Sequence, residues 1–189
     1  MRDMAPQPQT LGADIRALRR SRGLTLHDLA GQLNKSVGWM SQVERDMSDP
    51  SVADLRALAR ILNVPLSMLS TKKVLHQDEE GYVVRHHNRR SIGRDIEGLT
   101  EELLSPDLTD PFEVVYSHFA PFSRIKMPVT RDTQEVGYMV SGALDLTISG
   151  CEFTIHKGDS FRIRGEEFSW ANPYKEPAIA IWVIAPPVY

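Results

Sequence analysis

An arginine and a glutamate four residues apart precede a short apolar run in the segment PVTRDTQEVGYMVSG, residues 128–142. Arg131 carries a planar guanidinium that can bind a carboxylate or a phosphate through two hydrogen bonds. Glu135 carries a carboxylate that can accept from an amine or ligate a metal ion. The pair therefore predicts either a site for a small polar molecule or a structural salt bridge, depending on the elements that hold it.

Those elements are expected to be strands. Beyond Gly81 the chain consists of short apolar or alternating runs separated by glycine and proline, such as ALDLTIS, CEFTIH and AIAIWVIAPP. Turn signals recur about every ten residues, which is typical of antiparallel sandwiches and barrels. The sequence contains no glycine-rich phosphate loop and no serine nucleophile elbow. His86 and His87 are adjacent and would point to opposite faces of a strand, so we interpret them as surface residues.

The front half has a different period. Residues 11–69 place apolar side chains at helical spacing in five short segments. Thr25 and Ser36 are expected to cap the second and third segments, and Ser51 with Asp54 predicts a capping box at the fourth. Only a few residues separate the second segment from the third, which indicates a helix-turn-helix within a compact bundle.

The run LTLHDLAGQLNKSVGWMSQVERDMSDPSVADLRALARILNVPL resembles the lambda-repressor-like helix-turn-helix family, also called Cro/C1-type or XRE. The resemblance covers the whole helical part. It implies that the third segment lies in the major groove of DNA and that the second crosses the backbone. The residues that it implies for DNA binding are Thr25, Lys35, Ser36, Val37, Gly38, Trp39, Ser41, Gln42 and Arg45.

These residues are expected to differ in role. The amide of Gln42 can both donate to and accept from adenine, so Gln42 is the expected base reader. Lys35 and Arg45, with Thr25 and Ser41, suit phosphate contacts, which fix register without reading sequence. Val37 and Gly38 offer no side-chain hydrogen bonds, so DNA shape is expected to carry part of the specificity.

The same resemblance implies an ion pair between Arg19 and Glu44 with a structural role. The sequence departs from the family at Asp46, where glycine is usual, and at Lys35, where valine is frequent. An aspartate takes up the left-handed conformation less readily than glycine does.

The order EVGYMVSGALDLTI, FTIHKGDSFRIRGEEFSWANP and AIAIWVIAPP is similar to the cupin family, a small antiparallel β-barrel of jelly-roll type. Metal-binding cupins carry three histidines and a glutamate at positions that correspond to Val129, Arg131, Glu135 and Phe168. Only the glutamate is present. Because a divalent metal needs several imidazole or carboxylate ligands and a guanidinium repels it, we predict no metal and no cofactor.

The resemblance leaves two uses for Arg131. In one, it binds the anionic group of a small polar or zwitterionic metabolite while Glu135 binds an amine. In the other, it forms a salt bridge with Glu135 or Asp132 at the mouth of the barrel. The residues assigned to this pocket are Arg131, Glu135, Tyr138, Phe168, Ser169 and Trp170.

The whole chain is similar to bacterial regulators that join an XRE helix-turn-helix to a C-terminal cupin sensor, which implies an α + β protein of two domains. The helical domain is expected to be a five-helix bundle. We assign residues 1–9 to a disordered tail, 10–69 to the helix-turn-helix domain, 70–81 to a linker and 82–189 to the cupin domain.

Charge and composition agree with that division. Residues 1–75 carry 11 Lys and Arg against 7 Asp and Glu, a balance of +4, and residues 76–189 carry 11 against 18, a balance of −7. This asymmetry is expected of a basic module for a polyanion joined to an acidic one. The 189 residues contain no apolar run near membrane-spanning length, no secretory signal and one cysteine, Cys151, so we expect a cytoplasmic protein that does not insert into membranes.

The predicted function is that of a non-enzymatic transcriptional regulator. It is expected to act as a homodimer on a double-stranded, palindromic operator, with an affinity that changes when a small-molecule effector occupies the barrel. Two alternatives stay open: a metal-dependent cupin enzyme, and a DNA binder whose barrel only dimerises and senses nothing.

Overall fold

The chain forms two compact units in the computed structural model, which describes residues 10–69, 79, 81–92, 96–106, 108 and 110–188. The N-terminal unit runs to Arg90 and includes residues 105–110, and the C-terminal unit comprises residues 91–104 and 111–188. The predicted tail, residues 1–9, and most of the predicted linker, residues 70–78 and 80, lie outside the described residues.

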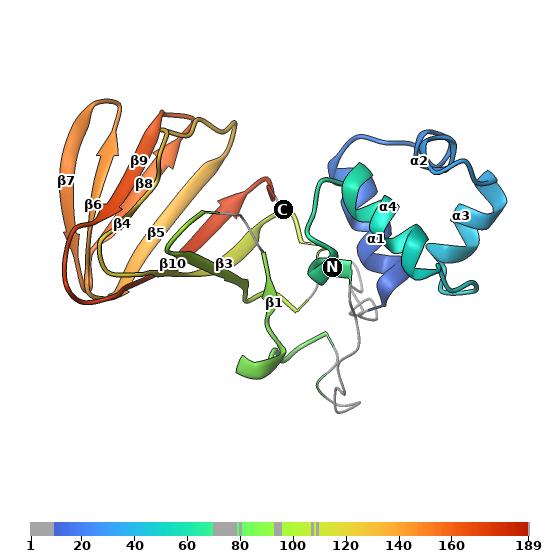
Figure 1. Ribbon diagram of the computed structural model, residues 1–189, viewed down its shortest axis with the longest axis horizontal. Coiled ribbons are helices and arrows are strands. Elements are labelled where there is room, and N and C mark those ends of the chain that lie inside the picture. Colours follow the sequence, from blue (N-terminus) through green and yellow to red (C-terminus); the bar gives the residue numbers. More distant parts are fainter. Residues whose placement is uncertain are drawn as a thin grey trace, which may run out of the picture. The chain divides into compact units, whose positions relative to one another are not determined.

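The described part of the N-terminal unit contains a bundle of four α-helices followed by a 3₁₀ helix (Figure 1). The predicted fifth helix is the 3₁₀ helix, in which Met68 N donates to Pro65 O over three residues. The elements are α1 (Leu11–Ser21), α2 (Leu26–Gln32), α3 (Val37–Val43), α4 (Val52–Ile61) and η1 (Leu66–Leu69).

Side chains cap the start of each α-helix. Thr10, Thr25, Ser36 and Ser51 each accept a hydrogen bond from the backbone amide three residues further on. At Thr25 and Ser51 the aspartate at that third position bonds back to the capping residue, which completes a capping box. The predicted starts of α2, α3 and α4 are confirmed.

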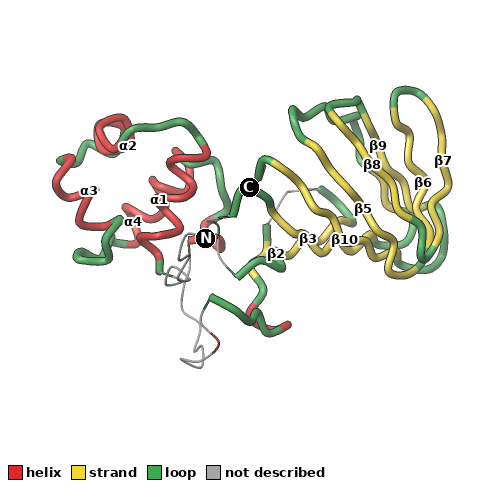
Figure 2. The backbone as a smooth tube through the Cα atoms, turned by 180° about the vertical axis from the view of Figure 1, so that it is seen from behind, coloured by secondary structure: helices red, strands yellow, loops and turns green. Residues whose placement is uncertain are grey.

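The four helices pack together (Figure 2), and their buried apolar residues form one core. Its members are at most 1% exposed and come from every helix, so the helical spacing seen in the sequence corresponds to the buried faces. They include Ile15, Leu18, Leu29, Ala30, Met40, Val43, Leu58, Leu62 and Met68.

Polar contacts tie α1 to the end of α3. Arg19 donates from Nε and Nη2 to the two carboxylate oxygens of Glu44, at 2.6 and 3.0 Å, which confirms the predicted ion pair. Asp46 has a φ of 57°, so it adopts the left-handed conformation although it is not glycine. Its Oδ1 accepts a hydrogen bond of 2.9 Å from the backbone amide of Gly12. The aspartate thus caps the first turn of α1, a contact that glycine could not make.

The segment after the predicted linker also belongs partly to this unit. His86 and His87 are exposed, as predicted, but they lie on a 3₁₀ turn, η3 (His86–Asn88), instead of a strand. Arg90 Nη1 is 2.7 Å from Oδ2 of the fully buried Asp14 on α1. This ion pair neutralises a carboxylate that would be unfavourable in the core by itself.

The C-terminal unit has two antiparallel sheets in its described part (Figures 1 and 2). The six-stranded sheet has the order β1 (Arg90–Ser91), β2 (Leu99–Leu103), β3 (Glu113–Phe119), β10 (Ala178–Ala185), β5 (Gln134–Ser141) and β8 (Ser160–Arg164). The four-stranded sheet has the order β4 (Ser123–Arg124), β9 (Phe168–Asn172), β6 (Ala143–Ile148) and β7 (Cys151–His156).

Strand residues alternate between the core and the outer surface. In β5, Glu135, Gly137 and Met139 are buried while Val136 and Tyr138 are exposed. Gly137 is required by its neighbour in β8, since a Cβ atom there would lie 2.1 Å from Cζ of Phe161. No helix in the described part of the chain is long and apolar enough to cross a membrane.

Candidate functional site

The surface of α3 carries several of the residues assigned to DNA binding. Val37 is 41% exposed, and Gly38, Gln42 and Arg45 are exposed beside it. Ser41 and Trp39 are half-buried. On the opposite side of the helix Met40 and Val43 pack into the core. The helix therefore presents one face to solvent, on which Gln42 is polar and Val37 apolar. Just beyond the end of the helix, Arg45 Nε donates to Ser41 O at 3.0 Å, which holds the guanidinium near that face.

Other assigned residues are engaged inside the unit. Thr25 Oγ1 donates to Asp28 Oδ2 at 2.6 Å, and Ser36 caps α3. Lys35 Nζ lies 3.0 Å from Asp54 Oδ1 and 4.8 Å from the centre of the Trp39 ring. If Lys35 bound a DNA phosphate, its ammonium would thus bind both the phosphate and Asp54. The Ser51 hydroxyl first, and Lys35 next, hold the pKa of Asp54 below its usual value.

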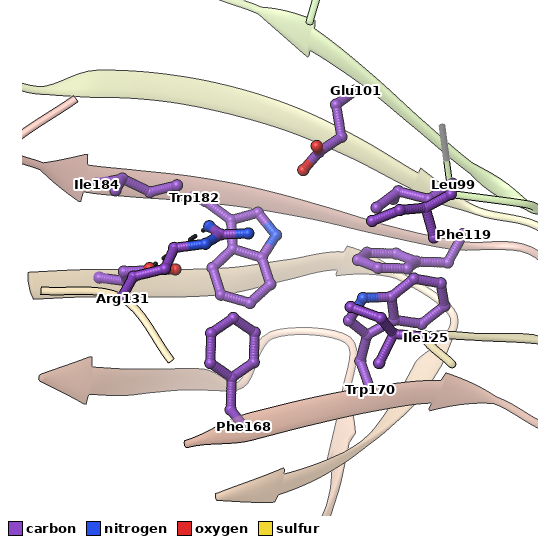
Figure 3. Close-up of a pocket in the computed structure, with 11 residues that line it drawn as sticks. Leu99, Glu101, Phe119, Ile125, Arg131, Phe168, Trp170, Trp182 and Ile184 are labelled. Carbon is purple, nitrogen blue, oxygen red and sulfur yellow. Dashed lines mark ion pairs between the residues drawn. The ribbon is translucent and has the colours of Figure 1, made fainter. Parts of the chain in front are cut away.

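A small cavity lies between the two sheets of the C-terminal unit (Figure 3). Its volume is about 30 Å³, room for about two water molecules. Four of the six residues assigned to the pocket line it, and seven others complete its wall. The lining consists of Arg131, Glu135, Phe168 and Trp170 with Ile96, Leu99, Glu101, Phe119, Ile125, Trp182 and Ile184.

Tyr138 and Ser169 do not line the cavity, so their assignment needs correction. Tyr138 is three residues from Glu135 on β5 and is 51% exposed on the outer face. Ser169 stands between the inward-facing Phe168 and Trp170 on β9 and lines a groove on the outer surface of the four-stranded sheet. Because strand side chains alternate, an odd separation places two residues on opposite faces.

The Arg131–Glu135 pair is formed, but loosely. Arg131 Nη1 is 3.6 Å from Glu135 Oε1, and its guanidinium carbon lies 5.7 Å from the centre of the Phe168 ring. Thr133 Oγ1 donates to the same Oε1 at 2.7 Å. Oε2 of Glu135 is buried and has no hydrogen-bond partner among the described residues. The glutamate is 1% exposed, so this oxygen is removed from solvent.

A second carboxylate and several rings complete the site, and of these only Phe168 and Trp170 were predicted from the sequence. Glu101 on β2 accepts a hydrogen bond from Ser117 Oγ at 3.2 Å, and Figure 3 shows its carboxylate directed toward the cavity. Phe119 packs edge-on against Trp170 with ring centres 4.7 Å apart, and Trp182 lies 6.2 Å from Phe168. The alternation of AIAIWVIA could have placed Trp182 inward, whereas nothing local marks Glu101.

The residues at this site do not fit a divalent metal. The backbones of Val129 and Phe168 form a β-bridge, and Arg131 and Glu135 lie beside it, so the positions matched to the cupin ligands do come together. Of those four side chains only the glutamate is a ligand type, and a guanidinium stands next to it. The part of the chain that is described holds no group of three or more His, Cys, Asp and Glu side chains able to bind a metal ion.

Comparison with known proteins assigns a domain family to each of the two units. Residues 10–70 match the family of helix-turn-helix domains, and residues 115–184 match the family of cupin domains. The chain therefore carries a helix-turn-helix domain followed by a C-terminal cupin domain.

Individual relatives match the chain in part. The immunity repressor protein of Bacillus phage phi105 is 29% identical over 98 residues, 52% of the chain and 67% of the repressor. The transcriptional regulator ClgR of Mycobacterium tuberculosis is 33% identical over 61 residues, 32% of the chain and 54% of ClgR. The chain thus spans between about half and two thirds of these proteins. A crystal structure of an HTH_3 family transcriptional regulator from Vibrio cholerae covers 95% of the chain and 97% of its own at 20% identity, with a TM-score of 0.46.

Proposed function

We propose that the chain is an XRE-type regulator that reads a specific DNA site with α3, acts as a homodimer and changes its DNA affinity when a small molecule occupies the cupin cavity. The observation that carries the DNA part is the exposed polar face of α3, held on the bundle by the Arg19–Glu44 pair. In this proposal Gln42 reads a base, and Val37 at the first turn contacts a thymine methyl group. Arg45 binds phosphate, with further backbone contacts from Lys35, Thr25 and Ser41.

The test of base reading starts from a duplex enriched from a randomised library at low salt, where phosphate contacts are strongest. Gln42→Ala should weaken binding to the enriched duplex by about 5- to 150-fold, since a good bidentate contact contributes about 1–3 kcal/mol of discrimination. Binding to an unrelated duplex should not change. The matched control is Gln32→Ala, an exposed glutamine at the end of α2, which should behave as the unchanged protein. Failure to bind any duplex at low salt would sink the proposal.

Phosphate contacts are tested by salt dependence. Each neutralised phosphate adds to the slope of the logarithm of affinity against the logarithm of salt concentration. Arg45→Ala should reduce the magnitude of that slope by about one and weaken binding to all duplexes alike. An effect confined to one base pair of the enriched site would instead assign Arg45 to base reading.

The homodimer has a candidate surface on the outer face of the six-stranded sheet. Val183 on β10 pairs across the strands with Val114 on β3 and with Val136 on β5. The next row pairs Ile181 with Tyr116 and Tyr138 in the same way. Val136, Tyr138 and Val183 are 49%, 51% and 42% exposed, so the rows form an apolar patch of the kind that a second copy covers.

The charges beside this patch are complementary under a two-fold axis. Glu102 on β2 continues the row of Tyr116 at one edge, and Arg162 on β8 continues the row of Val136 at the other. A two-fold axis along the central β10 would set Glu102 of one copy opposite Arg162 of the other. The apolar rows would then pack in the middle of an isologous interface with charged margins.

Light scattering tests the interface. Val183→Asp should shift the protein toward the monomer at micromolar concentration, because it places a charge in the centre of the apolar rows. Phe153→Asp is the matched control, since Phe153 is an equally exposed apolar residue on β7 of the other sheet, at 48%. A dimer that survives Val183→Asp, or dissociates only with Phe153→Asp, would place the interface elsewhere.

Neither alternative function is favoured by an observation at the site. The metal-dependent enzyme lacks a fitting donor set, because a guanidinium and a phenyl ring replace two of the matched ligands. The non-sensing barrel does not explain why a carboxylate oxygen beside the cavity is buried with no hydrogen-bond partner in the described part of the chain.

A further inference from the structure

We infer that the cupin cavity binds the ammonium group of a small primary amine. This inference rests on the proposed role of the cavity as a ligand site and assigns the chemical class of the ligand. Three observations carry it: the charge of the lining, the buried carboxylate oxygen of Glu135, and the aromatic walls.

The lining favours a cation. Among the described residues that line the cavity, Glu101 and Glu135 are acidic and Arg131 is basic, a formal balance of −1. Arg131 is already turned toward Glu135, at 3.6 Å, and lies over the ring of Phe168. An incoming carboxylate would meet two lining carboxylates of its own sign, whereas both of them would attract an ammonium.

Glu135 lacks the donor that an ammonium would provide. Its Oε1 accepts from Thr133 and faces Arg131, while its buried Oε2 has no partner among the described residues. An unsatisfied buried carboxylate oxygen is unfavourable. A primary ammonium has three N–H donors in a compact head group, so one N–H can bond to this oxygen while others remain for Glu101.

The walls and the volume set the size of the group. Phe119, Phe168, Trp170 and Trp182 surround the site, and the faces of aromatic rings attract cations. A volume of about 30 Å³ admits an ammonium with its first carbon but no whole metabolite. The remainder of a longer amine would extend toward solvent beside Arg131, whose side chain is 20% exposed.

The test is a thermal-shift and calorimetric titration of the full chain with ethylammonium, propionate and tetramethylammonium, all at ionic strength matched with sodium chloride. Ethylammonium should raise the melting temperature and give a saturable heat. Propionate should not, and tetramethylammonium should bind more weakly because it has no N–H donor and its four methyl groups exceed the cavity. Equal or stronger binding of propionate would overturn the inference, as would the absence of binding by all three.

Variants separate the site from general charge effects. Glu135→Gln keeps the size of the side chain and should weaken ethylammonium binding at least about tenfold, since it removes the charge. Glu167→Gln, an exposed position beside Phe168, is the control and should have no effect. Arg131→Gln removes the competing cation and should strengthen binding, which keeps the inference testable if Glu135→Gln fails to fold. Loss of ethylammonium binding in Arg131→Gln would overturn it.

The outcome is distinguishable from failure of the proposed regulation, because DNA affinity is measured on the same preparations with and without ethylammonium. Ethylammonium binding that leaves DNA affinity unchanged would support the cavity assignment and contradict sensing. DNA binding that responds to propionate alone would support sensing and contradict the amine assignment.

Discussion

Arg19 on α1 and Glu44 at the end of α3 face each other through hydrogen bonds of 2.6 and 3.0 Å, with side chains only 9% and 5% exposed. Arg19 Nη1 also donates to Leu24 O at 2.8 Å, so the guanidinium is shared between the ion pair and the turn before α2. Arg19 therefore fixes the positions of both α2 and α3 relative to α1. Glu44 also holds the pKa of Arg19 above its usual value, chiefly through the hydrogen bond.

Glu44→Ala should destabilise the helical unit by about 3–5 kcal/mol, because it leaves a buried guanidinium without its partner. Urea denaturation followed by circular dichroism measures this change. Replacing both residues, as Arg19→Met with Glu44→Leu, should recover much of the loss. The exposed neighbour Arg20 is the control, and Arg20→Ala should stay within about 0.5 kcal/mol. Unchanged stability with lost DNA binding would instead make Glu44 part of the DNA contact.

Two helical glycines should respond to alanine in opposite directions. A Cβ atom on Gly12 would lie 2.4 Å from the backbone oxygen of Val43, so Gly12→Ala must move α1 away from the end of α3 and should destabilise the unit by about 1–3 kcal/mol. Gly31 in α2 has open space, so Gly31→Ala should stabilise it by about 0.5–1 kcal/mol. Thermal melts of the two variants check both signs, and an equal effect would contradict this account.

Asn172 should contribute strongly to the stability of the C-terminal unit. It is fully buried, and its Nδ2 donates to Phe119 O at 3.1 Å and to Glu176 O at 3.0 Å, while its Oδ1 accepts from Tyr174 N at 3.1 Å. Asn172→Ala leaves these backbone groups without partners and should cost about 2–5 kcal/mol.

Asn172→Asp distinguishes the effect of side-chain volume from that of hydrogen bonding, because aspartate has nearly the same size. It keeps the acceptor for Tyr174 N but places a carboxylate oxygen against the carbonyl oxygens of Phe119 and Glu176. It should destabilise the unit at neutral pH at least as much as alanine does. Guanidinium denaturation followed by tryptophan fluorescence measures both variants. A neutral effect of Asn172→Asp would show that shape alone matters here.

Acid should weaken the helical unit through Asp54. Its pKa is lowered by the Ser51 hydroxyl and by Lys35, whereas in the unfolded chain it returns to about 3.9. A lowered carboxyl pKa stabilises the fold above the unfolded value, and this contribution is lost as the pH falls through the folded pKa. The melting temperature should therefore drop below about pH 4, and Asp54→Asn should reduce that drop. The control is the exposed Asp49, where Asp49→Asn should preserve the pH profile.

Local signals were sufficient to predict where helices of the N-terminal unit begin. The hydroxyl at Thr25 or Ser51 and the aspartate three residues later act within one turn, so the sequence alone predicts where α2 and α4 begin. The ion pair of Arg19 with Glu44 followed from the family resemblance. What the sequence missed is the use of Asp46, because the Gly12 amide that it caps is 34 residues away.

The cavity was predicted less completely, for a reason that lies in strand geometry. Grouping Tyr138 with Glu135, and Ser169 with Phe168, ignored the two-residue alternation that sends them to opposite faces. Glu101 could not be assigned, because its place at the cavity depends on the pairing of β2 with β3, which in turn lies beside β10. Strand order of this kind is a long-range property that no local pattern carries.

The alternation in β5 and β10 has one more consequence. Glu135 pairs with Ile184 on the cavity side, and the very next pair, Val136 with Val183, lies on the outer apolar face. Only the thickness of the six-stranded sheet would separate a bound amine from a second copy of the chain. A ligand that shifted these strands would also shift the proposed dimer surface directly. No intervening residues would be needed to couple the two sites.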